Sequence, residues 1–178
     1  KTTNAKGIFW NRCYQPHYIK QDTALKKKLI ELDVIVKSFN ASLLWEPWSI
    51  LKDDGTPYRV FTAFARRCRM SSLRPRTPLT KPRKLSLYQG LKKEIYNSTT
   101  NILFKPNWTK KIGGSWEIGE QVALCQLDQF LDNKLYGYKE KRNIPGINHT
   151  SRLSPFLSCG AISPNTIWHA TTKTIKGD

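Results

Sequence analysis

Long apolar runs are missing from this sequence, and none approaches the roughly 20 residues that a membrane span requires. Acidic residues are scarce, because 13 Asp and Glu stand against 30 Lys and Arg, which leaves a formal net charge of +17. Such a charge favours a polyanionic partner and carries no information about the fold. A secretory signal is also absent, and the chain opens at Lys1 without a methionine. We therefore expect a piece of a longer protein.

Cysteine is sparse and lacks the spacing of a metal site. The four cysteines are far apart in the chain, and no Cys-x-x-Cys or Cys/His pair occurs: Cys13, Cys68, Cys125 and Cys159. This pattern predicts no metal site and indicates free thiols in a reducing compartment. Together with the missing membrane span, it predicts a cytoplasmic protein without a membrane partner.

The sequence is long enough, at 178 residues with 39% hydrophobic, to bury a real core. Residues 7–10 form a bulky apolar run typical of a buried strand, and residues 34–39 return to β-branched side chains. Between them, Leu25, Leu29, Ile30 and Leu32 fall on one helical face, with Lys26, Lys27 and Lys28 pointing elsewhere. The order strand, helix, strand predicts part of a parallel α/β sheet. Its other strands are either missing, which would expose apolar faces, or supplied by another part of the protein.

The middle of the chain is basic and rich in proline. Residues 60–65 lead into Arg66, Arg67 and Arg69, which predicts a short basic helix. From residue 71 to about 116 the prolines argue against long regular elements, and Glu94 is the only acid between Arg59 and Lys111. We interpret this stretch as a basic linker on a surface.

The last third of the sequence predicts helices only. From Gly119 a stripe of Leu124, Leu127, Leu131, Leu135 and Tyr138 recurs every three or four residues. Two further helix starts follow at Ser154-Pro155 and Ser163-Pro164, where a capping hydroxyl precedes a proline suited to the first helical position.

Hydroxyl groups gather in the segment from Thr150 to Ser154. Thr150, Ser151 and Ser154 lie beside a predicted helix start, where backbone N–H groups lack partners, and Arg152 adds a fixed positive charge. This combination can hold a phosphate or a diphosphate. The alternative is that these side chains only cap a helix, which is the commoner role of Ser and Thr at such places.

Tyr138 and Arg142 are one helical turn apart and share a face. The tyrosine is suited to stacking on a flat ligand, and the arginine to reaching a phosphate. The commoner alternative is a tyrosine that closes the apolar stripe and an arginine in solvent at a helix end.

Several ordered blocks of this sequence together resemble the photolyase/cryptochrome family. They run from about residue 8 to residue 170, and no single block would suffice. The blocks are Trp10-Asn-Arg-Cys-Tyr-Gln-Pro16, Asn40-Ala-Ser-Leu-Leu-Trp-Glu-Pro47, Gly55-Thr-Pro-Tyr-Arg-Val-Phe-Thr62, Tyr138 with Arg142-Asn143-x-Pro145, Thr150-Ser-Arg-Leu-Ser-Pro155 and Gly160-x-Ile-Ser-Pro164.

The resemblance implies a three-part architecture, α/β followed by all-α, of which this chain is an internal fragment. Residues 1–70 would be the C-terminal part of a parallel-sheet antenna domain. Residues 71–115 would be the interdomain linker, and residues 116–178 the N-terminal part of a helical FAD-binding domain. The full-length protein is expected to be a monomer.

The resemblance also implies the chemistry, which is light-driven, FAD-dependent splitting of cyclobutane pyrimidine dimers by a carbon–carbon lyase. The residues carried over as FAD contacts are Tyr138, Thr150, Ser151, Arg152, Leu153 and Ser154. Arg142 would contact the backbone of UV-damaged DNA, and no catalytic residue falls within the segment. The family's tryptophan electron chain lies beyond residue 178, so the tryptophans present are assigned to packing.

Two departures from the family pattern concern the antenna and a local backbone position. His17 and Tyr18 stand where folate-binding relatives tend to place Asn and Glu, so the second chromophore is either of folate or of deazaflavin type, with Tyr18 as its candidate contact. Ala63 replaces a common proline. Two alternatives stay open: a cryptochrome photoreceptor without repair activity, and a generic basic nucleic-acid binder.

Overall fold

The computed structural model describes residues 4–86, 108–114 and 116–177. Contacts divide the chain into two compact units, residues 1–39 with 80–117 and residues 40–79 with 118–178. The predicted domain boundaries near residues 70 and 115 concern the intact protein and stay a prediction.

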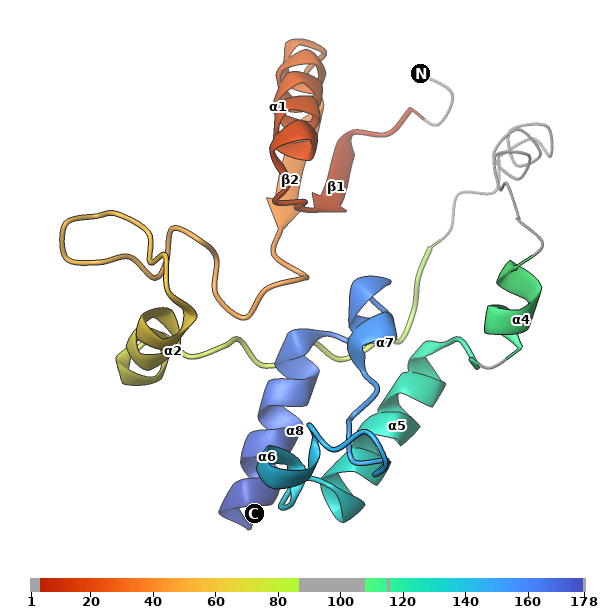
Figure 1. Cartoon of the computed structure of the whole chain (residues 1–178). Coiled ribbons are helices and arrows are strands. Elements are labelled where there is room, and N and C mark those ends of the chain that lie inside the picture. Colours follow the sequence, from red (N-terminus) through yellow and green to blue (C-terminus); the bar gives the residue numbers. More distant parts are fainter. Residues whose placement is uncertain (1–3, 87–107, 115, 178) are drawn as a thin grey trace. The chain divides into compact units, whose positions relative to one another are not determined.

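The first unit is built on a β-α-β motif. Strand β1 (Gly7–Asn11) is followed by helix α1 (Pro16–Glu31) and strand β2 (Ile35–Phe39). The two strands pair in parallel, with Gly7 opposite Ile35, and α1 runs beside them (Figure 1). The predicted piece of parallel sheet is therefore confirmed, and the single crossover helix is what lets the two strands run in the same direction.

One lysine of α1 lies against the strands. The Lys26 ammonium donates a hydrogen bond to Ser38 Oγ at 2.8 Å and lies 5.6 Å from the centroid of the Trp10 ring. Trp10 Nε1 in turn donates to Asp22 Oδ2 at 3.0 Å. The expectation that Lys26 points away with Lys27 and Lys28 is therefore wrong for Lys26. Its ammonium group lies over the tryptophan ring and also reaches a hydroxyl.

The sheet and its helix leave apolar side chains uncovered in the described part of the chain. Helix α1 has no buried residue, and Phe9 and Ile35 are 59% and 58% exposed. This agrees with the expectation for two strands without further partners. Helix α4 (Thr109–Gly113) is a single short turn in the same unit.

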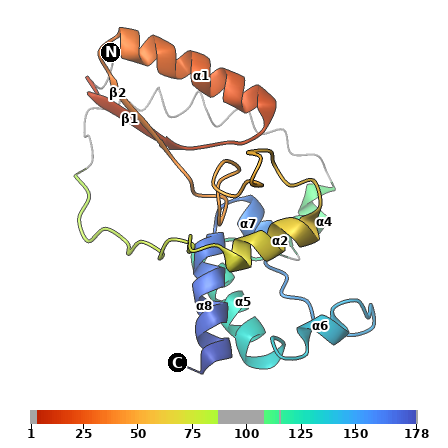
Figure 2. The same cartoon turned by 90° about the vertical axis from the view of Figure 1, so that its left-hand side faces the viewer.

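The second unit is helical. It contains α2 (Phe61–Met70), α5 (Glu120–Asn133), α6 (Tyr138–Lys141), α7 (Ser154–Ser158) and α8 (Pro164–Lys176). Helices α5 and α8 lie side by side (Figures 1 and 2). The buried apolar residues of the unit are Ile50, Cys68, Ala123, Leu127, Phe130, Leu131, Leu153, Phe156 and Ile162. The predicted change from α/β to all-α is confirmed.

Helix α5 ends earlier than its apolar stripe indicates. The stripe continues to Tyr138, but the helix stops at Asn133, and the Leu135 N–H donates back to the Phe130 carbonyl at 3.0 Å. Helix α6 then begins after Gly137. A glycine in this stretch disfavours a continuous helix, because its backbone loses more conformational freedom on ordering than that of any other residue.

The two predicted helix starts differ. Ser163 caps α8, since its Oγ accepts a hydrogen bond from the Thr166 N–H at 3.0 Å, as expected. The corresponding expectation for Ser154 is wrong, because α7 begins at Ser154 and Leu153 occupies the cap position without a side-chain cap bond. Leu153 is 3% exposed, so burial of its side chain sets where this helix begins.

The four cysteines are free thiols, and they differ in accessibility. Cys68 is buried, whereas Cys13, Cys125 and Cys159 are exposed. Burial raises the pKa of the Cys68 thiol because a thiolate would lose its hydration there.

We expect iodoacetamide at pH 8 to label Cys13, Cys125 and Cys159 well before Cys68, as followed by peptide mass spectrometry. The thiolate is the reacting species, and both the raised pKa and the burial lower its availability at Cys68. In urea all four should react at similar rates. Equal labelling of Cys68 in the native protein would show that its site is open.

Candidate functional site

Residues 150–154 lead into α7, and they differ in burial: their hydroxyl side chains are at least partly open to solvent, whereas Leu153 is in the core. Thr150 and Ser154 are exposed, Ser151 is half-buried and Leu153 is buried. Within the described residues, none of the three hydroxyls forms a hydrogen bond. Because the leucine anchors the segment to the core and the serines do not cap the helix, the hydroxyl groups remain available as donors and acceptors.

The backbone of this segment bends at Arg152. Its φ is +53°, a left-handed value that it shares among the described non-glycine residues only with Asn4 and Asp33. Asn and Asp adopt this region readily, whereas for arginine it costs on the order of 1–3 kcal/mol. Such conformations concentrate at functional sites, so the bend supports a ligand-binding role for residues 150–154.

Tyr138 and Arg142 are in contact. The Arg142 guanidinium lies 5.6 Å from the centroid of the Tyr138 ring, and the Arg142 N–H donates to the Tyr138 carbonyl at 3.0 Å. The Tyr138 ring also meets Phe130 edge-on, with centroids 5.3 Å apart. The tyrosine therefore closes the apolar stripe beside an exposed arginine, as the commoner alternative expects, and the roles of this pair toward flavin and DNA stay predictions.

His149, just before Thr150, packs on Gly137 at the start of α6. A Cβ placed on Gly137 would lie 2.8 Å from His149 Nε2, closer than real Cβ contacts allow. Nearby, Lys134 Nζ donates to Asn148 Oδ1 at 3.3 Å. Gly137 precedes Tyr138 and His149 precedes Thr150, so this contact links the two groups of predicted flavin residues.

Sequence reasoning missed this contact, and it also missed Asn165. His149 Nε2 and Asn165 Oδ1 are buried polar atoms without a hydrogen-bond partner among the described residues. Asn165 is 1% exposed in the first turn of α8. The position of Gly137 directly before Tyr138 was an available signal. Nothing in the local pattern marks Asn165, because its burial arises from the packing of α8.

The remaining sequence candidates lie elsewhere. Tyr18, the antenna candidate, is in the first turn of α1 in the first unit, 42% exposed, with its ring centroid 4.0 Å from that of His17. Its antenna role stays a prediction. Trp45 and Trp168 meet edge-on at 5.4 Å in the second unit, a packing contact in agreement with the role assigned to the tryptophans.

Two kinds of feature are absent from the described part of the chain. No group of three His, Cys, Asp or Glu side chains is placed to hold a metal ion. None of the helices in residues 4–86, 108–114 and 116–177 has the length and apolar character to cross a membrane.

Comparison with known proteins identifies the family. The DNA photolyase family pattern matches residues 1–83. A deoxyribodipyrimidine photo-lyase of Agrobacterium fabrum is 41% identical over 170 residues, which are 95% of this chain and 35% of that protein. The chain belongs to the DNA photolyase/cryptochrome family.

Photolyases and cryptochromes both occur among the relatives of this chain. Cryptochrome-1 of Arabidopsis thaliana is 30% identical over 177 residues, covering 95% of this chain and 25% of the cryptochrome. The crystal structure of a bacterial class III photolyase from Agrobacterium tumefaciens superposes with a TM-score of 0.81 at 39% identity, over 94% of this chain and 35% of that photolyase. The chain thus spans about a third of the length of these photolyases.

Substitution of Gly137 tests its steric contact with His149. We expect Gly137→Ala to destabilise the fold by about 1–3 kcal/mol, because the new methyl group must displace His149. The φ of Gly137, −102°, suits alanine, so without the clash alanine would instead stabilise.

Gly146→Ala is the matched control, since a Cβ there meets no atom within 4 Å. The combined change Gly137→Ala with His149→Ala should recover most of the loss in urea unfolding. Additive losses in this double-mutant cycle would show that the two residues do not interact.

Proposed function

We propose that the protein is a deoxyribodipyrimidine photolyase that repairs UV-damaged DNA in the light with FAD. The observation that carries this proposal is a set of three hydroxyls, exposed at Thr150 and Ser154 and half-buried at Ser151, that make no hydrogen bond among the described residues. They surround the left-handed bend at Arg152, in a chain of this family. Hydroxyls and backbone N–H groups beside a cation suit a diphosphate.

The chain's own residues fit the diphosphate and one face of a flavin. The hydroxyls of the 150–154 segment would hold the phosphates, while buried Leu153 fixes the segment to the core. Tyr138, held edge-on by Phe130, would lie beside the ligand in a fixed orientation. Once bound, reduced FAD supplies the photoexcited electron that opens the cyclobutane ring and recovers it afterwards.

Arg142 would position the DNA. It is exposed and supported by the Tyr138 ring, so its guanidinium can contact a phosphate without leaving that ring. Phosphate contacts fix the register of the duplex and contribute affinity that depends on salt. The dimer must leave the base stack to reach the flavin, and damage lowers the cost of that extrusion. A second chromophore of folate or deazaflavin type, near Tyr18, belongs to the same proposal.

A cryptochrome photoreceptor is the second candidate, favoured by the 30% identity with Arabidopsis cryptochrome-1. Both candidates would use the same residues for FAD, so these residues do not separate them. A measurement of repair activity separates the two candidates.

We expect the intact protein to bind FAD and, under blue light, to restore the 260 nm absorbance of UV-irradiated oligothymidylate. Residues 1–178 alone should not, because they hold only part of a flavin pocket. Thr150→Ala with Ser151→Ala should weaken FAD binding, measured by flavin absorbance after gel filtration, with Ser158→Ala as the control. FAD binding without restoration of the absorbance under blue light would favour the cryptochrome.

We expect Arg142→Ala to weaken binding to a UV-damaged duplex and to lower the slope of log K against log salt by about 0.9, the loss of one phosphate contact. Fluorescence anisotropy at several salt concentrations measures both. Lys173→Ala on α8 removes an equal charge elsewhere in the unit and serves as the control. An unchanged slope in Arg142→Ala would remove this residue from the DNA contact.

A further inference from the structure

Helix α2 has two faces of different chemistry. Phe61, Phe64 and Cys68, at helical spacings of three and four, line an apolar cavity of about 520 Å³ together with Trp45 and Trp168. This face is turned toward other parts of the second unit. The opposite face of α2 is therefore left exposed to solvent.

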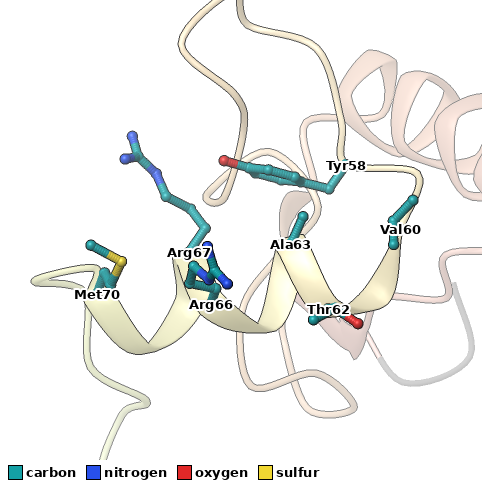
Figure 3. Close-up of a pocket in the computed structure, with 7 residues that line it drawn as sticks. All are labelled: Tyr58, Val60, Thr62, Ala63, Arg66, Arg67 and Met70. Atoms are coloured by element: carbon teal, nitrogen blue, oxygen red, sulfur yellow. The ribbon is translucent and has the colours of Figure 1, made fainter.

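A separate open hollow of about 460 Å³ lies on that opposite face (Figure 3). Its lining combines apolar, aromatic and cationic side chains: Tyr58, Val60, Ala63, Arg66, Arg67 and Met70. Tyr58 and Arg67 extend on the same side of the helix in Figure 3. The Tyr58 ring is braced by Phe64, with centroids 6.5 Å apart at 62°. An aromatic surface thus stands beside two guanidinium groups.

The positive charge continues beyond the hollow. Between residues 59 and 76 there are arginines and no Asp, Glu or Lys, and every arginine is exposed: Arg59, Arg66, Arg67, Arg69, Arg74 and Arg76. A surface of this kind attracts polyanions, and guanidinium groups match phosphate geometry.

The backbone around Arg74 and Arg76 is held in place by hydrogen bonds from two side chains. Trp45 Nε1 donates to the Leu73 carbonyl at 3.0 Å, and His169 Nε2 donates to the carbonyls of Pro75 and Arg76 at 3.1 and 3.2 Å. Pro75 is buried, whereas Arg74 and Arg76 on either side of it are exposed. Little ordering entropy is lost when such pre-positioned cations meet a ligand.

The nearby carboxylates are few. Asp53 pairs with Arg67 at 3.2 Å. Asp54 accepts hydrogen bonds from the Thr56 hydroxyl and N–H, which lower its pKa and keep it ionised. Glu120 shares a third hollow with Arg76. An exposed pair such as Asp53–Arg67 contributes little, so a phosphate can compete for Arg67.

We propose that this face of α2 binds single-stranded nucleic acid, with a base stacked on Tyr58 and its phosphates on Arg66 and Arg67. Arg74 and Arg76 then follow the strand. Tyr58 is half-buried, and an aromatic ring that is partly open to solvent among cations is the arrangement by which proteins hold unpaired strands without reading their sequence. The site is independent of the flavin residues and of Arg142, and it needs neither a lesion nor light.

The experiment measures binding of a fluorescein-labelled, undamaged oligothymidylate of about 20 nucleotides to the intact protein in the dark, by anisotropy at several salt concentrations. Arg66→Ala with Arg67→Ala should lower the salt slope by about 1.4, two contacts at roughly 0.7 each for single strands. Tyr58→Leu should weaken binding about tenfold, and Tyr58→Phe should leave it near the native value.

Two control variants separate a defined site from general charge. Lys27→Ala with Lys28→Ala on α1 removes the same charge and should have a much smaller effect. Asp53→Asn should tighten binding about two- to threefold by releasing Arg67, whereas Asp128→Asn on α5 makes the same charge change without that effect. Circular dichroism and flavin absorbance should be unchanged throughout, so failure here leaves the photolyase proposal untouched.

The proposal is overturned by any of three results. These are equal losses in the arginine and lysine pairs, no effect of Tyr58→Leu, or tighter binding of duplex DNA, anionic vesicles or polyglutamate with the same dependence on Arg66 and Arg67. Retained binding in Tyr58→Phe with loss in Tyr58→Leu supports it even if the arginine variant is unstable.

Discussion

The close packing of His149 on Gly137 constrains the part of the second unit on which the flavin proposal rests. The segment between α6 and α7 has no regular structure, so its path depends on a few contacts. The histidine fits only because position 137 has no Cβ, and buried Leu153 fixes the other end of the segment. Tyr138 and the hydroxyls of residues 150–154 adjoin these two contacts, which supports their assignment to one ligand.

Arginines occur in two different surroundings in the second unit, one beside Tyr138 and one on α2. Arg142 lies over the ring of Tyr138, where one phosphate contact would position a duplex. On α2, Arg66 and Arg67 border a hollow with an aromatic ring and belong to a longer run of exposed arginines. The cations behind the formal charge of +17 are therefore arranged differently at the two places. The single Arg142 suits a duplex, and the arginines of α2 suit a single strand.

Local pattern predicted the regular elements well, because strand and helix periodicities follow from which side chains must be buried. The two strands, the basic helix α2 and the Ser163 cap of α8 came from such patterns. Two of the misses have a common cause. Lys26 turns toward Trp10 and Leu153 displaces Ser154 from the cap, because contacts and burial made on folding outweigh a local preference. Helix α5 stops at Asn133 for a local reason, the glycine at position 137, which the apolar stripe does not record.

By itself, the sequence determined the class of the fold, the family and the residue types available for phosphate, flavin and nucleic acid, since these depend on composition and on ordered motifs. Tertiary structure alone decided that Tyr138 packs on Phe130, that Gly137 admits His149, and that Tyr58 lines one hollow with Arg66 and Arg67. The physical reason is that steric exclusion and burial act between residues brought together by folding, and a linear pattern does not record these distances.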